Sequence, residues 1–204
     1  RDWLVVGTTH EELVGQGYRP VGRQFTSYLH PESAEEYALP RGVAGGRSSD
    51  MERDVITDLR RRDLTINAMA MADDGTLVDP FGGREDVRNR QIRHVDGQHF
   101  LEDPIRTLRA TRLAARLNFQ LAPHTRRLIY SAAKDGTLQV LARERIYSEL
   151  VAGLMCGAPT RFIRELRSSG LLETLLPEVD QLFGIPQPAL YHPEIDTGIH
   201  ILLA

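Results

Sequence analysis

The sequence predicts an α+β fold in which a small mixed sheet comes first and an all-helical body follows. Two observations lead to this prediction. Strand and turn signals are confined to about the first 95 residues, and helical patterns then follow one another almost without interruption. Such separation of strands from helices favours α+β over a doubly wound sheet. The 204 residues also begin without methionine and end in an apolar run, so we expect a piece of a longer protein, truncated at both ends.

Composition excludes several classes of protein. Hydrophobic residues make up 41% and charged residues 26% of the chain, as in ordinary globular proteins, which argues against disordered, collagen-like and disulfide-rich proteins. No run approaches the ~20 apolar residues of a membrane helix, and the start does not resemble a secretory signal. Cys156 is the only cysteine, so no internal disulfide can form. We therefore expect a cytoplasmic protein without a membrane segment.

The basic residues are almost all of one kind. The net charge of −3 argues against a basic protein that coats nucleic acid, but every basic residue except Lys134 is an arginine. The planar guanidinium fork of arginine suits phosphate. A GC-rich genome is nevertheless the simpler explanation of the high ratio of arginine to lysine. Only the positions of the arginines can therefore support a function.

The N-terminal segment carries short strands and one capped helix. Residues 3–6 are apolar and end at Gly7, which predicts a buried strand. Two overlapping capping boxes in residues 8–12 predict a short helix that ends near Gly15 or Gly17. Extended segments are then expected in residues 18–29 and 36–39, followed by a loop rich in glycine, serine and arginine over residues 42–49.

From residue 50 onward the expected elements are mainly helices. The turn Asp73-Asp74-Gly75 and a loop over residues 78–83 interrupt them. Pro104 suits the first turn of a helix and would leave Asp103 as its N-cap. The helices are expected over residues 50–59, 64–70, 101–117, 123–134, 143–155 and 160–168.

Acidic residues near two of the strands could hold metal ions. Asp2 opens the first strand, where a carboxylate is most often a solvated end of the strand. A second carboxylate on the same face, at the position before Arg1, would allow the pair to bridge two divalent ions ~3.5–4 Å apart. Of Glu35 and Glu36, strand alternation lets only one share the face of Asp2. The simpler reading of this pair is that its charges protect a sheet edge.

A second group of candidates follows three consecutive arginines. Such a run beside an aspartate is often only a screened surface. Asp63 and Asn67 stand four residues apart, however, so they would share a helix face with Arg62 near its start. Asparagine both donates and accepts hydrogen bonds, and together with Asp63 and Arg62 it could read a base or hold a triphosphate.

A third group follows a strict three-residue step. Asp103, Arg106, Arg109 and Arg112 would form a ridge along one side of a helix. A salt-bridged exposed face usually alternates the sign of its charges, and little negative charge offsets these arginines later in the helix. A row of arginines that binds phosphate explains the pattern better.

The C-terminal end offers a weaker candidate. His192, Glu194, Asp196 and His200 are ligand types found in metal sites. A complete site needs further ligands, so a metal bound by these four residues alone is the less favoured interpretation.

Together these segments resemble bacterial class II tRNA nucleotidyltransferases, the CCA-adding enzymes of the polymerase-beta-like superfamily. The resemblance covers nearly the whole chain in the right order. It implies a nucleotidyltransferase head over residues 1–95 with its N-terminal part missing, a helical neck and body over 96–180, and the start of a truncated HD-type domain over 181–204. Five segments carry the resemblance. Residues 1–7 resemble the family's paired-carboxylate motif, and residues 36–41 resemble the motif with its third acid. Residues 61–68 resemble the arginine-aspartate-asparagine motif, 102–106 the glutamate-aspartate-arginine motif, and 191–200 the segment that leads into the HD domain.

The resemblance also implies a reaction. Enzymes of this family add CMP, CMP and AMP to the 3′ end of tRNA from CTP and ATP, without a nucleic-acid template, by two-metal nucleotidyl transfer. By this resemblance Asp2 would bind Mg²⁺ and Glu36 would polarise the attacking 3′-hydroxyl. The nucleotide would be contacted by Arg62, Arg109 and Arg112, held by Asp63 and Asn67, and its base read by Asp103 and Arg106.

Some features of the family are absent from the chain. The glycine-rich start, the first acid of the pair and the histidine-aspartate pair of the HD domain are missing, and the loop after Arg41 is short. The resemblance therefore does not extend to activity of this chain by itself. Three alternatives remain open: a poly(A) polymerase of the same superfamily, a non-catalytic RNA-binding module, and a mainly hydrolytic HD protein. The oligomeric state is not predicted.

Overall fold

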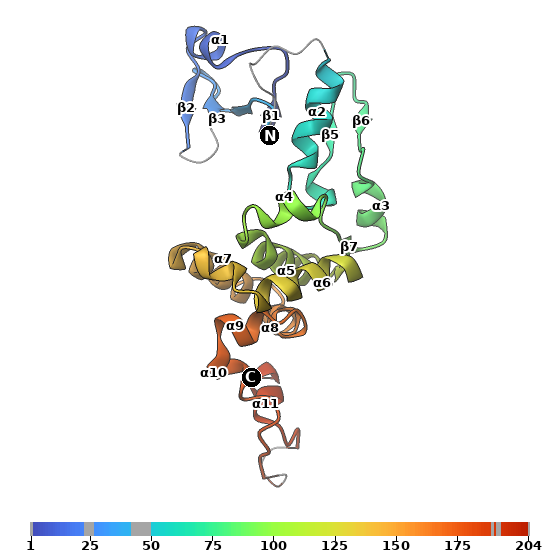
Figure 1. The fold of residues 1–204 in the computed structure, drawn as a ribbon, viewed down its shortest axis with the longest axis vertical. Helices are drawn as coiled ribbons and strands as arrows, with labels where there is room; N and C mark the ends of the chain where they lie inside the picture. Colours follow the sequence, from blue (N-terminus) through green and yellow to red (C-terminus); the bar gives the residue numbers. More distant parts are fainter. Residues whose placement is uncertain (1, 23–26, 42–49, 189, 191–192, 204) are drawn as a thin grey trace.

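The computed structural model describes residues 2–22, 27–41, 50–188, 190 and 193–203. The expected loop over residues 42–49 and the candidate His192 lie outside this part. The molecule is elongated, with a small sheet and helix α2 at one end, layers of helices in the middle, and α11 near the other end (Figure 1). The α+β prediction is confirmed. None of the described helices is long and apolar enough to cross a membrane.

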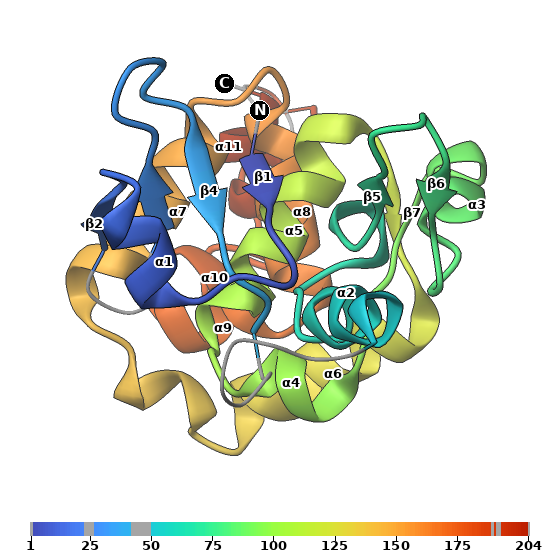
Figure 2. The same cartoon turned by 90° about the horizontal axis from the view of Figure 1, so that it is seen from above.

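A four-stranded mixed sheet forms the first layer, in the order β1-β4-β3-β2. β1 pairs with β4 in parallel, and the other pairs are antiparallel. Figure 2 shows β1 and β4 side by side. The expected strands at residues 3–6 and 36–39 are confirmed, each shifted by one residue or more at its ends. The four strands are Asp2–Leu4, Arg19–Val21, Ser27–Leu29 and Glu36–Ala38, for β1 to β4 in turn.

Local chemistry explains the elements of this layer. Helix α1, His10–Gly15, begins with the expected capping box, in which Thr9 and Glu12 bond reciprocally. Aromatic rings also pack against one another across the strands. Tyr37 on β4 stacks on Trp3 with a centroid distance of 6.1 Å and meets Tyr18 edge-on at 5.2 Å.

Helix α2, Met51–Arg60, confirms the helix expected there, with Asp50 as its N-cap. The helix expected over residues 64–70 is wrong. A single 3₁₀ turn, η1 (Thr65–Asn67), takes its place and is followed by strand β5, Ala70–Met71. The reason is an external partner for the backbone: Leu64 bridges His94, and the Thr65 N–H donates to the Arg93 carbonyl at 2.9 Å.

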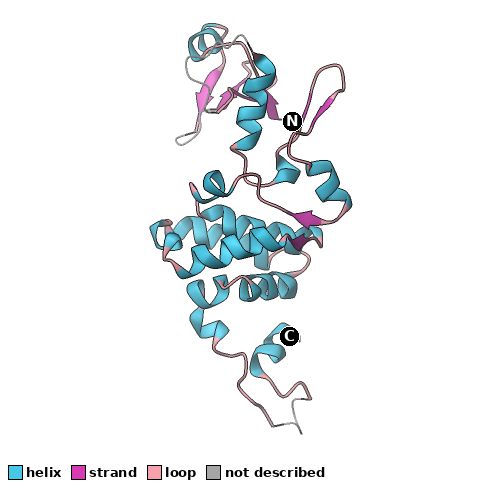
Figure 3. Ribbon diagram, turned by 45° about the vertical axis from the view of Figure 1, so that its right-hand side comes forward, coloured by secondary structure: helices cyan, strands magenta, loops and turns pink. Residues whose placement is uncertain are grey.

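A short hairpin lies beside α2, and a parallel strand pair lies at the edge of the helical layers (Figure 1). β5 pairs with β6, Leu77–Val78, across the expected turn, where Gly75 has φ +84°. After α3, Gly83–Arg88, strand β7 (Gln91–Ile92) pairs in parallel with β8 (Gln120–Leu121). The body is therefore not entirely helical as expected. Two-residue strands carry too little alternation to be seen in the sequence. Figure 3 shows this pair at the edge of the helical layer.

The helical layers match the sequence pattern closely, with one break. The helix expected over residues 101–117 begins only at Ile105 and is α5, Ile105–Leu117, while a separate short helix that was not expected, α4, Gly97–Leu101, precedes it. Pro104 is the N-cap of α5, not Asp103, because the Asp103 carboxylate bonds to Arg145 and does not cap. The remaining elements are α6 Pro123–Lys134, η2 Thr137–Val140, α7 Arg143–Leu154, α8 Pro159–Ser168, α9 Leu171–Leu175, α10 Pro177–Asp180 and α11 Thr197–Leu203.

The main core lies under α5. Fully buried side chains from α4 to α9 meet there, among them Phe100, Leu108, Ile129 and Phe162. Helices α7 and α8 approach closely at Gly153, where a Cβ would lie 2.2 Å from the ring of Phe162. A buried ring has no room to move, so this crossing requires glycine. The core fixes α5, which carries the arginine row, as a rigid base for the site.

We expect Gly153→Ala to lower the free energy of unfolding by about 1–3 kcal/mol, because the added methyl displaces the Phe162 ring. The gain in helix propensity, up to about 1 kcal/mol, is smaller than this cost. Urea denaturation measures the change. Gly157→Ala is the matched control, since nothing lies within 4 Å of its Cβ position. Equal stability of the two variants would contradict the close crossing.

Candidate functional site

The two acidic candidates of the sheet occupy matching positions. Asp2 on β1 and Glu36 on β4 are direct register partners in the parallel pair. The side chain of Asp2 lies outside the described part of the structure. Glu35, the other acid that the sequence offered, accepts a hydrogen bond from the Ser33 hydroxyl at 3.3 Å. The register thus pairs Asp2 with Glu36 and not with Glu35.

A pocket of about 410 Å³ lies beyond the end of β4, between the segment after α2 and helix α5. Four arginines, one aspartate and one asparagine line it. Five of the six were expected from the sequence, and Arg41 was not, although this residue closes the motif that begins at Glu36. The lining residues are Arg41, Arg62, Asp63, Asn67, Arg106 and Arg109.

Asp63 organises the turn that forms one wall of this pocket. Its Oδ1 accepts hydrogen bonds from the Leu64 N–H at 2.9 Å and from Asn67 Nδ2 at 3.1 Å. Among the described residues the buried Oδ2 has no hydrogen-bond partner, and Nε of Arg109 lies 3.5 Å away from it. Asp63 is 8% exposed, while the Arg109 side chain is 51% exposed. A ligand could therefore find both an unused carboxylate oxygen and a guanidinium here.

Two of the lining arginines share one buried anchor. Asp58 on α2 is 2% exposed. Its Oδ2 contacts Nε and an Nη of Arg62, both at 3.1 Å, and its Oδ1 accepts from the Arg41 N–H at 3.0 Å. Burial lowers the pKa of Arg41, and the charge of Asp58 opposes that shift. Arginine remains protonated at any ordinary pH, so both walls stay positively charged.

A second buried acid supports the turn from behind. Asp86 on α3 accepts hydrogen bonds from the Thr65 hydroxyl and from Nε of Arg93. Helix α3 packs against the turn so closely that a Cβ on Gly83 would lie 2.2 Å from the Thr65 carbonyl oxygen. The turn with Asp63 and Asn67 is therefore held by long-range contacts, not by helical propensity.

The four residues of the predicted ridge do not face one site. A three-residue step turns the helix by about 300°, so each member is rotated by about 60° from the one before. Arg106 donates to the His99 carbonyl at 2.8 Å and still lines the pocket, as Arg109 does. Arg112 instead pairs with Glu149 on α7, with an N–O distance of 2.6 Å.

Asp103, the first member, also meets α7. Its carboxylate forms a bidentate pair with Arg145, with N–O distances of 3.0 and 2.7 Å. This hydrogen bonding raises the pKa of Arg145. Neither Asp103 nor Arg112 lines the pocket. Arg145 and Glu149 stand four residues apart on α7, so one face of that helix holds both outer members of the ridge.

The C-terminal candidates serve the local structure. Backbone hydrogen bonds from Ile199 and Gly184 to Asp196 lower the pKa of this carboxyl, and His200 pairs with Glu194. Among the described residues, no group of three or more His, Cys, Asp or Glu side chains could hold a metal ion. The described part of this segment therefore gives no support to a metal site.

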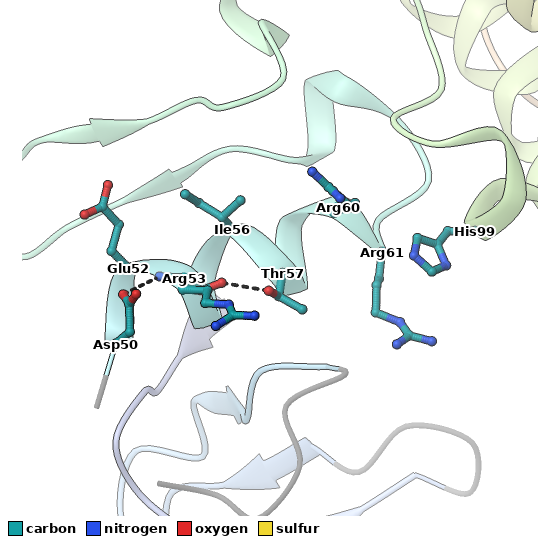
Figure 4. A pocket seen from close by; sticks show the side chains of 8 residues that line it. All are labelled: Asp50, Glu52, Arg53, Ile56, Thr57, Arg60, Arg61 and His99. Atoms are coloured by element: carbon teal, nitrogen blue, oxygen red, sulfur yellow. Dashed lines mark hydrogen bonds between the residues drawn. The ribbon is translucent and has the colours of Figure 1, made fainter. Parts of the chain in front are cut away.

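The arginine run 60–62 is divided between two pockets. Arg60 and Arg61 line a second pocket of about 540 Å³ on the other face of α2 (Figure 4). His99 from α4 lies near Arg61 in it, and both pair with Glu102, at 2.8 and 3.7 Å. Arg53, Asp50 and Glu52 line the same pocket, so three arginines face two acids there. In the pocket with Arg62 four arginines face one acid, so the larger excess of positive charge lies there.

Two family models match separate parts of the chain. The family model "Poly A polymerase head domain" matches residues 29–93, and "Probable RNA and SrmB- binding site of polymerase A" matches residues 118–183. The Multifunctional CCA protein of Chromobacterium violaceum is 49% identical over 99% of this chain and 51% of its own length. That of Alkalilimnicola ehrlichii is 50% identical over 100% and 52%. The chain thus spans about half the length of these relatives.

Solved structures give the same result. A CCA-adding enzyme in complex with ATP is 28% identical, with a TM-score of 0.71, over 87% of this chain and 43% of that one. A tRNA nucleotidyltransferase complexed with a primer tRNA and an incoming ATP analog is 31% identical, with a TM-score of 0.64, over 84% and 52%. With similar sequence over nearly its whole length and a similar fold, the chain belongs to the family of the CCA-adding tRNA nucleotidyltransferases.

Proposed function

We propose that the protein adds CMP, CMP and AMP to the 3′ end of tRNA from CTP and ATP, without a nucleic-acid template. The observation that carries this proposal is the pocket of four arginines beyond the end of β4. Relatives in solved structures bind ATP, CTP and tRNA, as their names state. Because the chain spans half of its relatives, the activity is proposed for the protein at their full length.

The pocket suits a nucleoside triphosphate. Arg41, Arg62 and Arg109 present guanidinium forks, which bind phosphate oxygens in a bidentate way. Arg112 pairs with Glu149 and would have to exchange this partner before it could reach the nucleotide, as the family resemblance implies. Asp63 and Asn67 then hold the nucleoside by hydrogen bonds to its donor and acceptor groups.

Enzymes of this family use divalent metal ions, and we propose Mg²⁺. The register of β1 and β4 fits such an ion, because it brings the two acidic positions Asp2 and Glu36 to the same level of the sheet. Carboxylate oxygens are the ligands that Mg²⁺ prefers. Asp2 would hold the ion, which neutralises phosphate charge when bound. Glu36 would polarise the 3′-hydroxyl of the tRNA.

The base would be chosen by Asp103 and Arg106. An aspartate accepts from an exocyclic amine and an arginine donates to ring acceptors, so the pair fits cytosine and adenine and rejects guanine and uracil. In this structure Asp103 is held by Arg145, and Arg106 by the His99 carbonyl. Reading a base requires Asp103 to exchange its partner.

The proposal extends to domain organisation and location. Residues 1–95 form the nucleotidyltransferase head, 96–180 the neck and body, and 181–204 the start of an HD-type domain. The matches of the two family models, to residues 29–93 and 118–183, support the first boundary. A protein that acts on tRNA with ATP and CTP would work in the cytoplasm.

One assay separates this function from its rivals. With tRNA that lacks its terminal CCA and with CTP alone, we expect the addition of two C residues, measured by extension of end-labelled tRNA. A poly(A) polymerase would add none under these conditions. An RNA-binding module would bind tRNA with a steep salt dependence and incorporate nothing when Mg²⁺ is added.

A further inference from the structure

The buried carboxylate of Asp58 joins two walls of the nucleotide pocket. Arg41 lies in the segment that follows β4, and Arg62 lies in the segment that follows α2, twenty-one positions later in the chain. Asp58 contacts the first through Oδ1 and the second through Oδ2, at 3.0 and 3.1 Å. Both arginines line the pocket, whereas Asp58 does not.

Burial separates the anchor from any ligand. Asp58 is 2% exposed, while the side chains of Arg41 and Arg62 are 38% and 33% exposed. A ligand in the pocket therefore meets the two guanidinium groups but not the carboxylate behind them. Nη1 of Arg62 also reaches the Asn67 carbonyl at 3.4 Å, which ties the anchored arginine to the turn of η1.

We propose that Asp58 is a positioning residue for nucleotide binding, and that Arg41 is a phosphate-binding residue of the same pocket. This proposal rests on the proposed function of the pocket. Two long side chains lose much rotational freedom when a phosphate binds them. Asp58 removes part of that freedom beforehand, because its Oδ2 holds the guanidinium of Arg62. Its Oδ1 fixes the backbone N–H of Arg41 and lies 3.9 Å from Nε of the same residue.

The negative charge of Asp58 and its positioning of the arginines have opposite effects on the Kd for a nucleotide. The proposal can therefore be tested by measuring this Kd. Removing a negative charge next to the pocket should tighten the binding of a polyanion. Loss of positioning should weaken it. Asp58→Asn keeps an acceptor oxygen for the Arg41 N–H and removes both the negative charge and the ion pair with Arg62, so the sign of the change in Kd shows which effect is larger. We expect the Kd for MgCTP and MgATP, measured by calorimetry, to rise about tenfold.

Steady-state kinetics and a double-mutant cycle test whether Asp58 affects nucleotide binding through Arg62. KM for the nucleotide should rise while kcat changes little, because Asp58 does not meet the reacting atoms. In an Arg62→Ala background, Asp58→Asn should raise the Kd by less than threefold, since the anchored side chain is already gone. Arg41→Ala alone should also weaken MgCTP binding. An unchanged or tighter Kd for Asp58→Asn, or full additivity with Arg62→Ala, overturns the proposal.

Asp54→Asn is the matched control. Asp54 lies one turn earlier on α2, is also buried (6% exposed), and forms no ion pair within the part of the chain that the structure describes. Its Kd should equal that of the parent. If Asp58→Asn fails to fold by circular dichroism, Asp58→Glu replaces it, because the added methylene displaces the carboxylate while its charge stays.

The same experiment distinguishes failure of this inference from failure of the proposed function. If Arg62→Ala and Arg109→Ala leave MgCTP binding unchanged, the pocket is not the nucleotide site and the proposed function of these residues is wrong. If both weaken binding but Asp58→Asn and Arg41→Ala do not, only the roles given to Asp58 and Arg41 are wrong.

Discussion

Asp2→Ala is expected to abolish the incorporation of both CMP and AMP, with a loss of about a thousandfold or more in rate. The physical reason is the register of the parallel strands, which places the position of Asp2 directly beside Glu36 at the edge of the sheet. Loss of one carboxylate removes a ligand of the ion that would neutralise the triphosphate. Single-turnover extension of tRNA with CTP, and then with ATP, measures the change in the protein at its full length.

The arginine pocket should be unaffected by this change, because none of its lining residues belongs to β1. Nucleotide binding should therefore persist in Asp2→Ala even though transfer is lost. Glu35→Ala is the control among the sheet-edge acids, since Glu35 bonds to Ser33 and is not the register partner of Asp2. It should retain the parent rate. Transfer at a normal rate by Asp2→Ala would contradict the assignment of Asp2 as a metal ligand.

Local signals predicted those elements whose stability is local. Helix α6, Pro123–Lys134, has the predicted bounds because a proline at its first turn and Gly136 just beyond its end mark both ends in the sequence. The capping box that begins α1 is of the same kind. In each of these cases the residues that fix the end lie within a few positions of it.

Elements held by distant partners were predicted wrongly or missed. The turn of η1 is fixed by Arg93, which lies 28 positions beyond Thr65. Asp103 does not cap α5 because Arg145, 42 positions away, holds its carboxylate. Arg41 joins the pocket through Asp58. Composition and periodicity carry no record of such pairs, so the sequence could identify the motifs but not the contacts between them.

Asp103→Ala is the variant with the largest expected effect on base choice. The substitution removes the carboxylate that would accept a hydrogen bond from the exocyclic amine of cytosine or adenine. We expect the preference for CTP over UTP to fall by about 10- to 100-fold, while the Kd for tRNA stays within about twofold. Competition between CTP and UTP on tRNA that lacks CCA gives the preference, and filter binding gives the Kd.

Arg145→Ala tests whether Asp103 acts on the base or only through its ion pair. In the structure the two side chains form a bidentate pair between α7 and the start of α5, so either substitution breaks the same contact. If Asp103 served only to hold α7, both variants would change the preference for CTP equally. Arg145→Ala keeps the acceptor and releases it from its partner, so we expect it to retain most of the preference that Asp103→Ala loses. Equal losses in the two variants would assign Asp103 a structural role and leave Arg106 alone to read the base.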